Sequence, residues 1–480
     1  GGAIGNSTAL SSLNVTGATA LSNNVTTTGA QTYNSAITLG GDANLTTTNS
    51  NISLAAVNGA RNLALSTGTG TIALNGNIGS GTALTSFSAT NTGAANNLAL
   101  ANSINATTTS FNLGGALSQS AGSINTTTLN TTTAGGASLS GSNTIANFNA
   151  TNSGSGNIAL TNTGALNING INQTAGNVVI NNTGAITQSG AAAVSGTSTF
   201  NAGANAITLT NAANNFTGAV SVNNSGANNV ALRNSGVLTL GTSAVGSGTL
   251  GLTGVGISQT GAITQAASAG ATTVNAGAGV INLNNSGNDF TGLLNLSNSG
   301  NNAVTVNNTS VADTVNGLRL GTIGVGSGAT SITNSGVLTT SGNITSNGGS
   351  VSLATQSAGI ARNLTVNGNI SSNGGNIVLS AANNGTGSAD PLTVNGLLNT
   401  GAGSGGTLIL GGGVVLNSTL TVGAGDITLQ GNGANLTLSG TQTFNTAVNF
   451  SVTGNVNLNN ADVSSTGGAL TFSSPVNING

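Results

Sequence analysis

The few charged side chains are the first place to look for chemistry in this sequence. Asp289 and Asp313 are close enough along the chain to meet on neighbouring turns of a coiled fold, and two carboxylates are the usual apparatus of glycoside cleavage. The other four aspartates are widely spread over the 480 residues. A catalytic carboxylate pair needs a cleft and specific charge partners, and the sequence indicates neither. We therefore interpret both residues as solvated turn carboxylates.

Two glycine-rich segments match short binding motifs. Gly246–Gly251 fits G-x-G-x-x-G, but that motif binds a dinucleotide only where a helix follows it. Because 77 of the residues are Gly, about two chance matches are expected for the motif. Gly423–Asp426 resembles part of a calcium-binding nonapeptide, which requires its Asp to recur turn after turn. It does not recur here, so we predict no metal site and no cofactor.

The residue types that are missing exclude most catalytic machinery. The chain has no His, Cys, Met, Trp, Lys or Glu. Nucleophilic triads need a base such as His or Lys, and zinc sites need His or Cys. We therefore expect a protein that is not an enzyme, with no catalytic, cofactor-binding or metal-binding residues.

The cations are too few to bind nucleic acid or anionic lipid, both of which require a basic surface. We interpret all four as turn or surface residues that aid solubility; they are Arg61, Arg233, Arg319 and Arg362. No uncharged apolar run approaches the roughly 20 residues of a membrane-spanning helix. The opening residues show no signal peptide, and we read the chain as a processed or truncated piece.

Short runs with a period of two residues recur along the whole chain. Asn62–Leu65, Asn97–Leu100, Asn229–Leu232 and Asn435–Leu438 are examples, each rich in Leu, Ile, Val or Thr at alternate positions. This pattern predicts short β-strands. Gly, Asn and Ser lie between the runs, where turns need their backbone freedom and side-chain hydrogen bonds. We find no convincing helical periodicity.

The sequence repeats itself at two lengths. Ser341–Leu353 returns at Asn367–Leu379, and Leu364–Gly368 returns at Leu392–Gly396. These copies indicate coils of about 26–28 residues between positions 341 and 400.

A longer repeat lies before them. Between positions 80 and 340 we expect repeats of about 61–80 residues, marked by Phe87, Phe148, Phe216 and Phe290. In the same region Gly184–Gln188 returns as Gly261–Gln265. The last three of these Phe are expected to fill the core, with a sugar-stacking surface as the weaker alternative.

Taken together, these patterns predict an all-β, right-handed parallel β-helix that runs as one continuous solenoid through residues 1–480. We expect roughly 20 coils of about 20–28 residues with about three short strands each. Aliphatic side chains would fill a narrow core, and turn asparagines would stack their amides from coil to coil. Stacked like charges would repel, which accounts for a charged fraction of only 2%.

Three segments carry a resemblance to a family. Asn288–Gly292, Leu364–Leu379 and the Gly-Ala-Ile-Thr-Gln motif resemble the repeat region of filamentous-haemagglutinin-like large exoproteins of Gram-negative bacteria. These are adhesins exported by two-partner secretion or as autotransporter passengers. The resemblance implies a β-helical shaft at the bacterial surface. The family's secretion domain and its Asn-Pro-Asn-Leu signature are absent, and no functional residue is carried over.

We therefore expect a secreted structural fibre or adhesin shaft at the bacterial cell surface or in a biofilm matrix. Self-association, end to end or lateral, and host or cell-surface glycans are the expected partners. The alternative is a carbohydrate-binding or ice-binding solenoid face. The ice-binding face is suggested by threonine runs at Thr26–Thr28, Thr107–Thr109, Thr126–Thr128 and Thr131–Thr133. A polysaccharide lyase is a third possibility, but such enzymes need basic residues and acidic clusters that this chain lacks.

Overall fold

The computed structural model describes residues 2–309, 317–356, 362–381, 390–401, 406–417, 420–421, 427–430, 435–444, 448–450, 452 and 454–479. All regular elements of these residues are β-strands, which stack in parallel as a β-solenoid of about 20 turns. The chain divides into two compact units, Gly1–Asn224 (unit 1) and Ser225–Gly480 (unit 2). The predicted all-β, parallel solenoid is confirmed.

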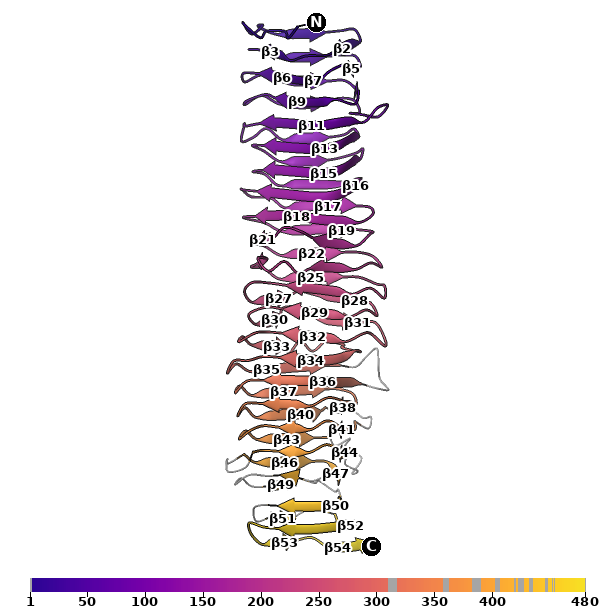
Figure 1. Ribbon diagram of the computed structural model, residues 1–480, viewed down its shortest axis with the longest axis vertical. Helices are drawn as coiled ribbons and strands as arrows, with labels where there is room; N and C mark the ends of the chain where they lie inside the picture. The colour runs from indigo at the N-terminus through magenta and orange to yellow at the C-terminus, as the bar shows by residue number, and fades with distance from the viewer. Residues whose placement is uncertain are drawn as a thin grey trace. The chain divides into compact units, whose positions relative to one another are not determined.

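Within unit 1 the strands follow one another coil by coil (Figure 1). They are β1 (Leu13–Val15), β2 (Thr19–Leu21), β3 (Val25–Thr27), β4 (Gln31–Tyr33), β5 (Ile37–Leu39), β6 (Ala43–Thr47), β7 (Ile52–Leu54), β8 (Val57–Asn58), β9 (Asn62–Ser66), β10 (Ile72–Leu74), β11 (Leu84–Asn91), β12 (Leu98–Leu100), β13 (Ile104–Leu113), β14 (Leu117–Gln119), β15 (Ile124–Thr133), β16 (Ala137–Asn152), β17 (Ile158–Asn162), β18 (Leu166–Gln173), β19 (Val178–Asn182), β20 (Ile186–Gln188), β21 (Ala192–Val194), β22 (Ser198–Asn201), β23 (Ile207–Leu209), β24 (Asn215–Phe216) and β25 (Val220–Asn223).

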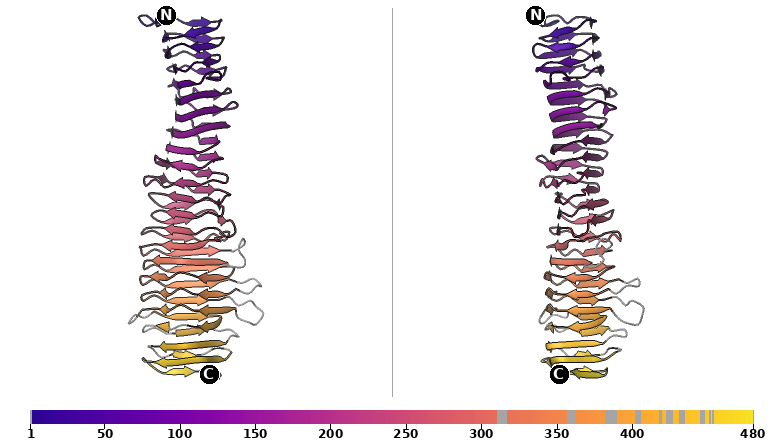
Figure 2. Two further views of the ribbon diagram at one scale, coloured as in Figure 1. Left: turned by 45° about the vertical axis from the view of Figure 1, so that its right-hand side comes forward. Right: turned by 90° about the vertical axis from the view of Figure 1, so that its right-hand side faces the viewer.

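Unit 2 is built in the same way, as the two further views in Figure 2 also show. Its strands are β26 (Val230–Arg233), β27 (Leu238–Leu240), β28 (Ser243–Val245), β29 (Leu250–Thr253), β30 (Ile257–Gln259), β31 (Ile263–Gln265), β32 (Thr272–Asn275), β33 (Ile281–Leu283), β34 (Leu293–Ser297), β35 (Val304–Asn308), β36 (Leu318–Val325), β37 (Thr330–Asn334), β38 (Leu338–Thr340), β39 (Ile344–Ser346), β40 (Val351–Thr355), β41 (Leu364–Val366), β42 (Ile370–Ser371), β43 (Ile377–Ser380), β44 (Pro391–Val394), β45 (Leu398–Asn399), β46 (Leu408–Gly411), β47 (Gly413–Leu416), β48 (Leu420–Thr421), β49 (Ile427–Gln430), β50 (Leu436–Phe444), β51 (Val448–Phe450), β52 (Val456–Ser465), β53 (Leu470–Phe472) and β54 (Val476–Asn479).

Coil length varies more than the sequence predicts. Register partners on successive coils are as close in sequence as Leu13 and Gln31, and as far apart as Ile377 and Leu408. The expected range of coil lengths is therefore too narrow at both ends. Where the sequence repeats are clearest their offsets equal the register, because Leu364 pairs with Leu392 one coil later. Extra residues enter at turns, since a solenoid coil contacts only its neighbours.

Several strands in unit 1 are much longer than the four-residue runs, such as Asn62–Leu65, from which short strands are predicted. β13 and β15 have 10 residues each, and β16 has 16. In unit 2, β36 lies beside both β38 and β39, so one long strand takes the place of two short ones. The same side of a coil can therefore be one long strand or two short ones. The difference is whether the backbone hydrogen bonding of a strand continues through the bend.

The core is a stack of inward side chains from successive coils. One column in unit 1 contains Leu63, Phe87, Thr109, Leu129 and Phe148, all buried. The small Thr109 lies between two larger side chains, which allows the column to fill without voids. Burial of each large apolar side chain contributes about 1.5–3 kcal/mol, so these columns supply the main stabilisation of the fold.

The phenylalanines confirm the core prediction. Phe148 and Phe290 are 0% exposed and Phe216 is 2% exposed. Phe216 also packs edge-on against Phe200, with ring centroids 6.1 Å apart. Such edge-to-face pairs add about 0.5–1.5 kcal/mol beyond the area that they bury. None of these three rings is available as a surface platform for sugars.

Candidate functional site

Outward side chains on five neighbouring strands of unit 1 form a regular array of hydroxyl and amide groups, here called the polar grid. Its fifteen positions lie on β11, β13, β15, β16 and β18, and all are half-buried or exposed. The three columns, in register from coil to coil, are Ser86–Thr108–Thr128–Asn147–Asn167, Ser88–Ser110–Asn130–Asn149–Gly170 and Thr90–Asn112–Thr132–Thr151–Asn172. All but one are Ser, Thr or Asn.

The spacing of the grid follows from strand geometry. Successive coils lie about 4.8 Å apart, and alternate residues of one strand lie about 6.8 Å apart. Only some threonines of the predicted runs reach this surface, because side chains alternate between the two faces of a strand. Thr132 is exposed, whereas its neighbours Thr131 and Thr133 are buried. The threonine runs therefore supply part of the grid and part of the core.

Most grid side chains have no hydrogen-bond partner within the described part of the chain. The third column, from Thr90 to Asn172, lies at one edge of the grid and is here called the outermost column. Its side chains make no hydrogen bond among the described residues. At the other edge, the amide of Asn167 donates to the side-chain oxygen of Asn147 at 3.1 Å. The outermost column thus presents its donors and acceptors to solvent.

The turn asparagines behave in the opposite way, since they are used by the solenoid itself. The backbone N–H of Asn44 donates to Oδ1 of Asn24, one coil earlier, at 2.9 Å. At the ends of β22 and β25, just before the turns, the amide of Asn223 donates to Oδ1 of Asn201 at 2.8 Å. In unit 2 the same ladder links Asn417, Asn395 and Asn367 at 2.9 and 2.8 Å. The predicted stacking of turn amides is confirmed.

Pairs of a Gln amide with a buried Asn amide link neighbouring coils in both units. In unit 1 the side chains of Gln119 and Asn143 donate to each other at 3.0 Å in both directions. Asn143 is 0% exposed and also accepts the N–H of Ile124 at 2.7 Å. Its amide donates further to the carbonyl oxygen of Thr161 at 3.1 Å. Such a satisfied network is stabilising, and losing one member would leave several buried groups unpaired.

The same pair recurs twice more along the chain. Gln188 and Asn214 pair in unit 1 at 2.5 and 3.0 Å, and Gln259 and Asn288 pair in unit 2 at 2.8 and 2.9 Å. In each case the Gln is the last residue of its strand. The N–H of Ile263 donates to Oδ1 of Asn288 at 2.9 Å, as Ile124 does to Asn143.

Sequence reasoning missed these pairs. The repeated Gly-Ala-Ile-Thr-Gln motif matches Gln188 with Gln265, whereas the side chain that makes the equivalent pair is Gln259. A shorter four-residue motif marks the correct glutamines. It consists of Leu or Ile, then Ser or Thr, then Gln, then Ser or Thr. It occurs at Gln119, Gln188 and Gln259, at nearly equal intervals along the chain.

The glycine motif at Gly246–Gly251 has a structural explanation. Strand β29 begins inside this segment, at Leu250, so the helix required by a dinucleotide site is not there. A Cβ at Gly246 would meet the carbonyl oxygen of Gly226, and one at Gly248 would meet that of Asn228. These glycines allow one coil to lie directly against the previous one.

Asp289 does not lie where the sequence analysis expects it. Its side chain is 6% exposed, and its residue bridges to Thr264 on the adjacent coil. The interpretation of Asp289 as a solvated turn carboxylate is therefore wrong, because its side chain is buried even though it lies in register with the half-buried Thr264. Asp313, its suggested partner, lies outside the described residues, as does Gly423–Asp426. Among the described residues no cluster of three or more His, Cys, Asp or Glu could hold a metal ion.

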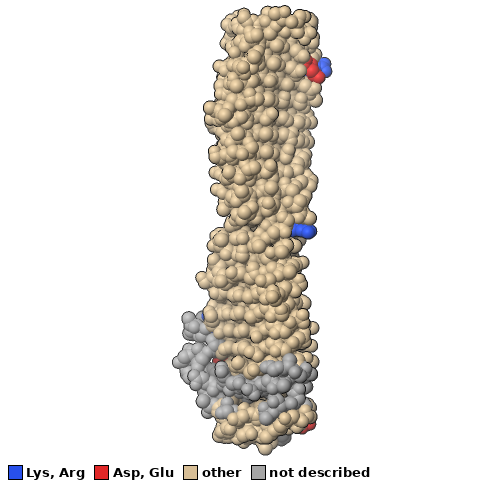
Figure 3. Space-filling view, turned by 90° about the vertical axis from the view of Figure 1, so that its left-hand side faces the viewer, with Lys and Arg blue, Asp and Glu red and all other residues tan. Residues whose placement is uncertain are grey.

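The arginines also differ from one another. Arg61 and Arg233 are exposed, as expected of surface residues. Arg319 is half-buried, and its Nη2 donates to the carbonyl oxygen of Thr291 at 2.8 Å. The expectation of a simple surface role is therefore wrong for Arg319, whose guanidinium ties one coil to the preceding one. Figure 3 shows how sparse charged atoms are on the face in view.

Two titratable groups in unit 1 have shifted pKa values. The N–H and the side-chain amide of Asn62 donate to Asp42 at 2.9 and 2.8 Å, and with nearby Arg61 they lower the pKa of that carboxyl. Burial raises the pKa of Tyr33 to about 12. Its hydroxyl lies 3.4 Å from Oε1 of Gln31. Asp42 takes the place of a turn asparagine in the ladder and Tyr33 fills the core, so both shifts follow from structural roles.

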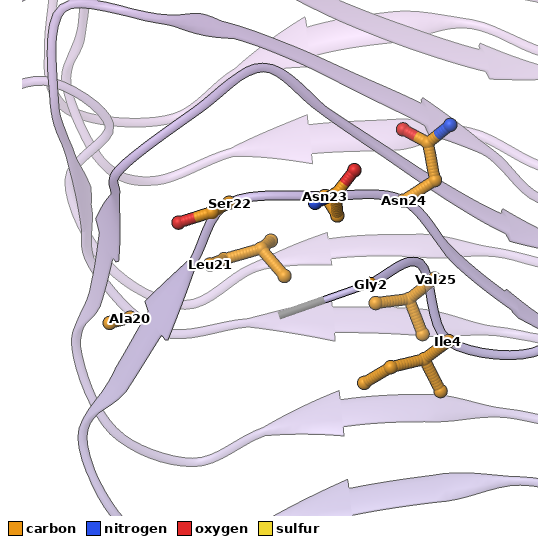
Figure 4. Close-up of a pocket in the computed structure, with 8 residues that line it drawn as sticks. All are labelled: Gly2, Ile4, Ala20, Leu21, Ser22, Asn23, Asn24 and Val25. Carbon is orange, nitrogen blue, oxygen red and sulfur yellow. The ribbon is translucent and has the colours of Figure 1, made fainter.

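A small cavity lies at the first coils of unit 1. Its volume is about 160 Å³, and its walls include Ile4, Leu21, Val25 and Asn24 (Figure 4). None of the residues that line it carries a titratable side chain. The cavity therefore offers no acid or base for chemistry.

Comparison with protein families finds two matching stretches. Residues 155–223 and 227–297 each match a family described as repeats of unknown function (DUF5649). The chain carries a repeat-protein region. Each matched stretch contains one Gln–Asn pair, Gln188 with Asn214 in the first and Gln259 with Asn288 in the second. No curated protein and no solved structure matches the chain. The described residues contain no helix long and apolar enough to cross a membrane.

Proposed function

We propose that this chain is part of a secreted, non-catalytic structural fibre or adhesin shaft at a bacterial cell surface, of the filamentous-haemagglutinin-like kind. The observation that carries the proposal is where the polar side chains are used. Buried amides such as Asn143 and Asn288, and turn amides such as Asn395, bond to neighbouring coils and not to a cavity. A chain that uses its polar groups to join one coil to the next is suited to bearing mechanical load and to holding other domains away from the cell.

Repeats support the same proposal. A module that returns with the same amide pair can be added or lost in evolution while each coil still contacts only its neighbours. Low charge and repetition together suit an extended scaffold at the cell exterior. The short motifs that resemble the exoprotein family add to this, because that family uses β-helical shafts to project from the outer membrane.

The experiment that tests the proposal is surface labelling of intact cells of the source bacterium. Antibodies raised against the purified chain should label unpermeabilised cells and external fibres seen by electron microscopy. Deleting the gene should remove both the label and the fibres. Labelling that appears only after the cells are permeabilised would contradict the proposed location and role.

The alternative is a binding face for carbohydrate or ice, and the polar grid is the observation that favours it. Hydroxyl and amide groups such as those of Thr132 and Asn172 could hydrogen-bond to sugar hydroxyls or to ordered water. A panel of immobilised glycans and a thermal hysteresis measurement on the purified chain distinguish these two uses. We rank this alternative second, because the grid mixes Thr, Ser and Asn without a repeated Thr-x-Thr on every coil.

A further inference from the structure

We infer that the polar grid of unit 1 is a lateral pairing surface on which a second copy of this chain packs face to face. The inference rests on the proposed role as a fibre component and names the surface through which fibres would join sideways. It starts from the contrast between the satisfied turn amides and grid side chains such as Thr90, Thr132 and Asn172. The latter have no partner in the described part of their own chain.

Charge is the first argument for a second copy as the occupant. None of the fifteen grid positions is charged. A face that meets its own copy across a two-fold axis brings each side chain near an identical one, so any charge on it would repel itself. An anionic or cationic polymer would instead require Arg or Asp on this surface.

Spacing is the second argument. A partner gains a hydrogen bond on every coil only if its own groups repeat at about 4.8 Å along the stack and about 6.8 Å across it. A second copy of the grid has this lattice by construction, because its strands obey the same geometry. A glycan or an ice surface would match it only by coincidence of its own repeat.

Side-chain size is the third argument. Ser, Thr and Asn are short, so rows from two copies can interdigitate closely, as in the dry interfaces between paired sheets. Short side chains also lose little conformational entropy when they are fixed. Asn and Thr carry both donors and acceptors, so two identical rows can bond to each other without a complementary partner sequence.

The area is sufficient for a specific contact. Five coils and three columns span about 24 by 20 Å, or about 500 Å² on each copy. The pair would then bury about 1,000 Å² in total, which is the size that a specific protein interface is expected to exceed. The outermost column also continues toward the N-terminus through Ser66, Thr46 and Thr26, which extends the same surface.

The test places a charge at the centre of the grid in the full 480-residue chain. Asn130→Lys is compared with Ser331→Lys, a matched change at an exposed outward position of β37 in unit 2. Sedimentation equilibrium of the wild-type chain should show self-association. Asn130→Lys should weaken it at least tenfold, while Ser331→Lys should leave it unchanged. Circular dichroism of both variants should match that of the wild type.

A second variant separates repulsion from misfolding. Asn130→Glu alone should also fail to associate, whereas an equimolar mixture of Asn130→Lys and Asn130→Glu should regain association. A wild-type chain that stays monomeric at every concentration overturns the inference. If that monomer co-sediments with an insoluble neutral glucan, the face belongs to a polysaccharide instead. Equal association of Asn130→Lys and wild type would also overturn it.

Each proposal can fail alone. A chain that labels the cell surface but remains monomeric in solution overturns only the pairing surface. A chain that associates through Asn130 but is found only inside cells overturns only the proposed function.

Discussion

Units 1 and 2 use the same interior but present different exteriors. Both contain buried columns of aliphatic side chains and at least one reciprocal Gln–Asn pair. Outside, unit 1 carries the polar grid on long strands, whereas an outward column of unit 2 runs Thr305–Ser331–Ser352–Val378–Ile409 and changes from polar to apolar.

The difference shows which positions are constrained. An inward residue must fill a fixed space and satisfy its polar atoms, because voids and unpaired groups in the core are costly. An outward residue only has to be compatible with the extended backbone of a strand. A uniform run of Ser, Thr and Asn at outward positions of unit 1 is therefore not explained by folding alone, and it supports the surface role proposed above.

The substitutions with the largest expected effect on stability test whether the Gln–Asn pairs in the cores of the two units are equivalent. Asn143→Leu in unit 1 and Asn288→Leu in unit 2 each remove the acceptor of a buried backbone N–H, that of Ile124 or Ile263, and both hydrogen bonds of a Gln–Asn pair. Each change should lower the free energy of unfolding of its unit by about 3–5 kcal/mol. Chemical denaturation followed by circular dichroism measures the loss.

The matched control for that pair is Asn172→Leu, at an exposed grid position. It should change the stability by less than about 0.5 kcal/mol. Similar losses at the buried and exposed positions would mean that the amide pairs do not carry the stability assigned to them. A loss in only one unit would break the equivalence of the two interiors.

Alkaline pH should affect unit 1 and spare unit 2. Tyr33 is the only tyrosine, and its pKa is raised to about 12 because it is buried. A raised pKa means that the folded state favours the neutral phenol. The contribution of Tyr33 to stability is therefore complete below about pH 10 and is lost as the pH rises toward about 12, at a cost of about 3 kcal/mol.

Ultraviolet absorbance of tyrosinate measures that titration directly, since the chain has no Trp. The midpoint should lie near 12 in the folded chain and near the ordinary value of 10 in denaturant. Tyr33→Phe should remove this pH dependence from unit 1. An unshifted midpoint in the folded chain would show that Tyr33 is solvated.

Stabilising substitutions should work equally in both units. Thr109 and Thr131 in unit 1, and Thr272 and Thr330 in unit 2, have buried hydroxyls with no hydrogen-bond partner among the residues that the structure describes. Valine has a closely similar shape, so each Thr→Val change removes an unsatisfied group and should stabilise by about 1 kcal/mol.

Thr330→Val is the clearest case, because its register neighbours are Val304 and Val351. Thermal or chemical unfolding gives the change in stability, and Thr132→Val, on the exposed face, is the control. Destabilisation by Thr330→Val would indicate a water or a hydrogen bond that the core column holds.

The smallest effect concerns Asp42, which is exposed. The hydrogen bonds from Asn62, and then the charge of Arg61, lower its pKa. Because the pKa of Asp42 is lowered, its contribution to stability is present above the ordinary pKa of a carboxyl group. That contribution is lost as the pH falls through the lowered pKa. NMR titration of the Asp42 carboxyl should show this midpoint.

Asp42→Asn should keep the ladder, because Asn24 makes the same backbone contact to Asn44 at 2.9 Å. It should also abolish the weak loss of stability at low pH that comes from the Asp42 turn of unit 1. A large loss of stability in Asp42→Asn would show that the charge itself, and not the hydrogen bonds, holds this turn.

Much of the fold could be predicted from local pattern. Alternation such as Ile37–Thr38–Leu39 predicts a strand with two inward residues, and both Ile37 and Leu39 are buried. The offsets between repeated segments predicted the register of Leu338, Leu364 and Leu392. These features depend only on the period of a strand and on similarity between neighbouring coils.

The site could not be predicted in the same way. A run such as Thr131–Thr132–Thr133 does not reveal which threonine points outward, because an irregularity in an adjacent coil shifts the frame, as it does between Phe148 and Asn149. The amide pairs join residues 24 to 29 positions apart, and the wrong glutamine fits the local motif equally well.

By itself, the sequence determined that the chain is a low-charge, all-β repeat protein whose large side chains face a narrow core, because composition and a period of two residues are local properties. Only the tertiary structure decided that Gln259 pairs with Asn288, that Asp289 is buried and that fifteen outward positions align as a grid. The physical reason is that each depends on which residue lies one coil away. Coil length is not constant, since it ranges from the short step between Leu13 and Gln31 to the long one between Ile377 and Leu408.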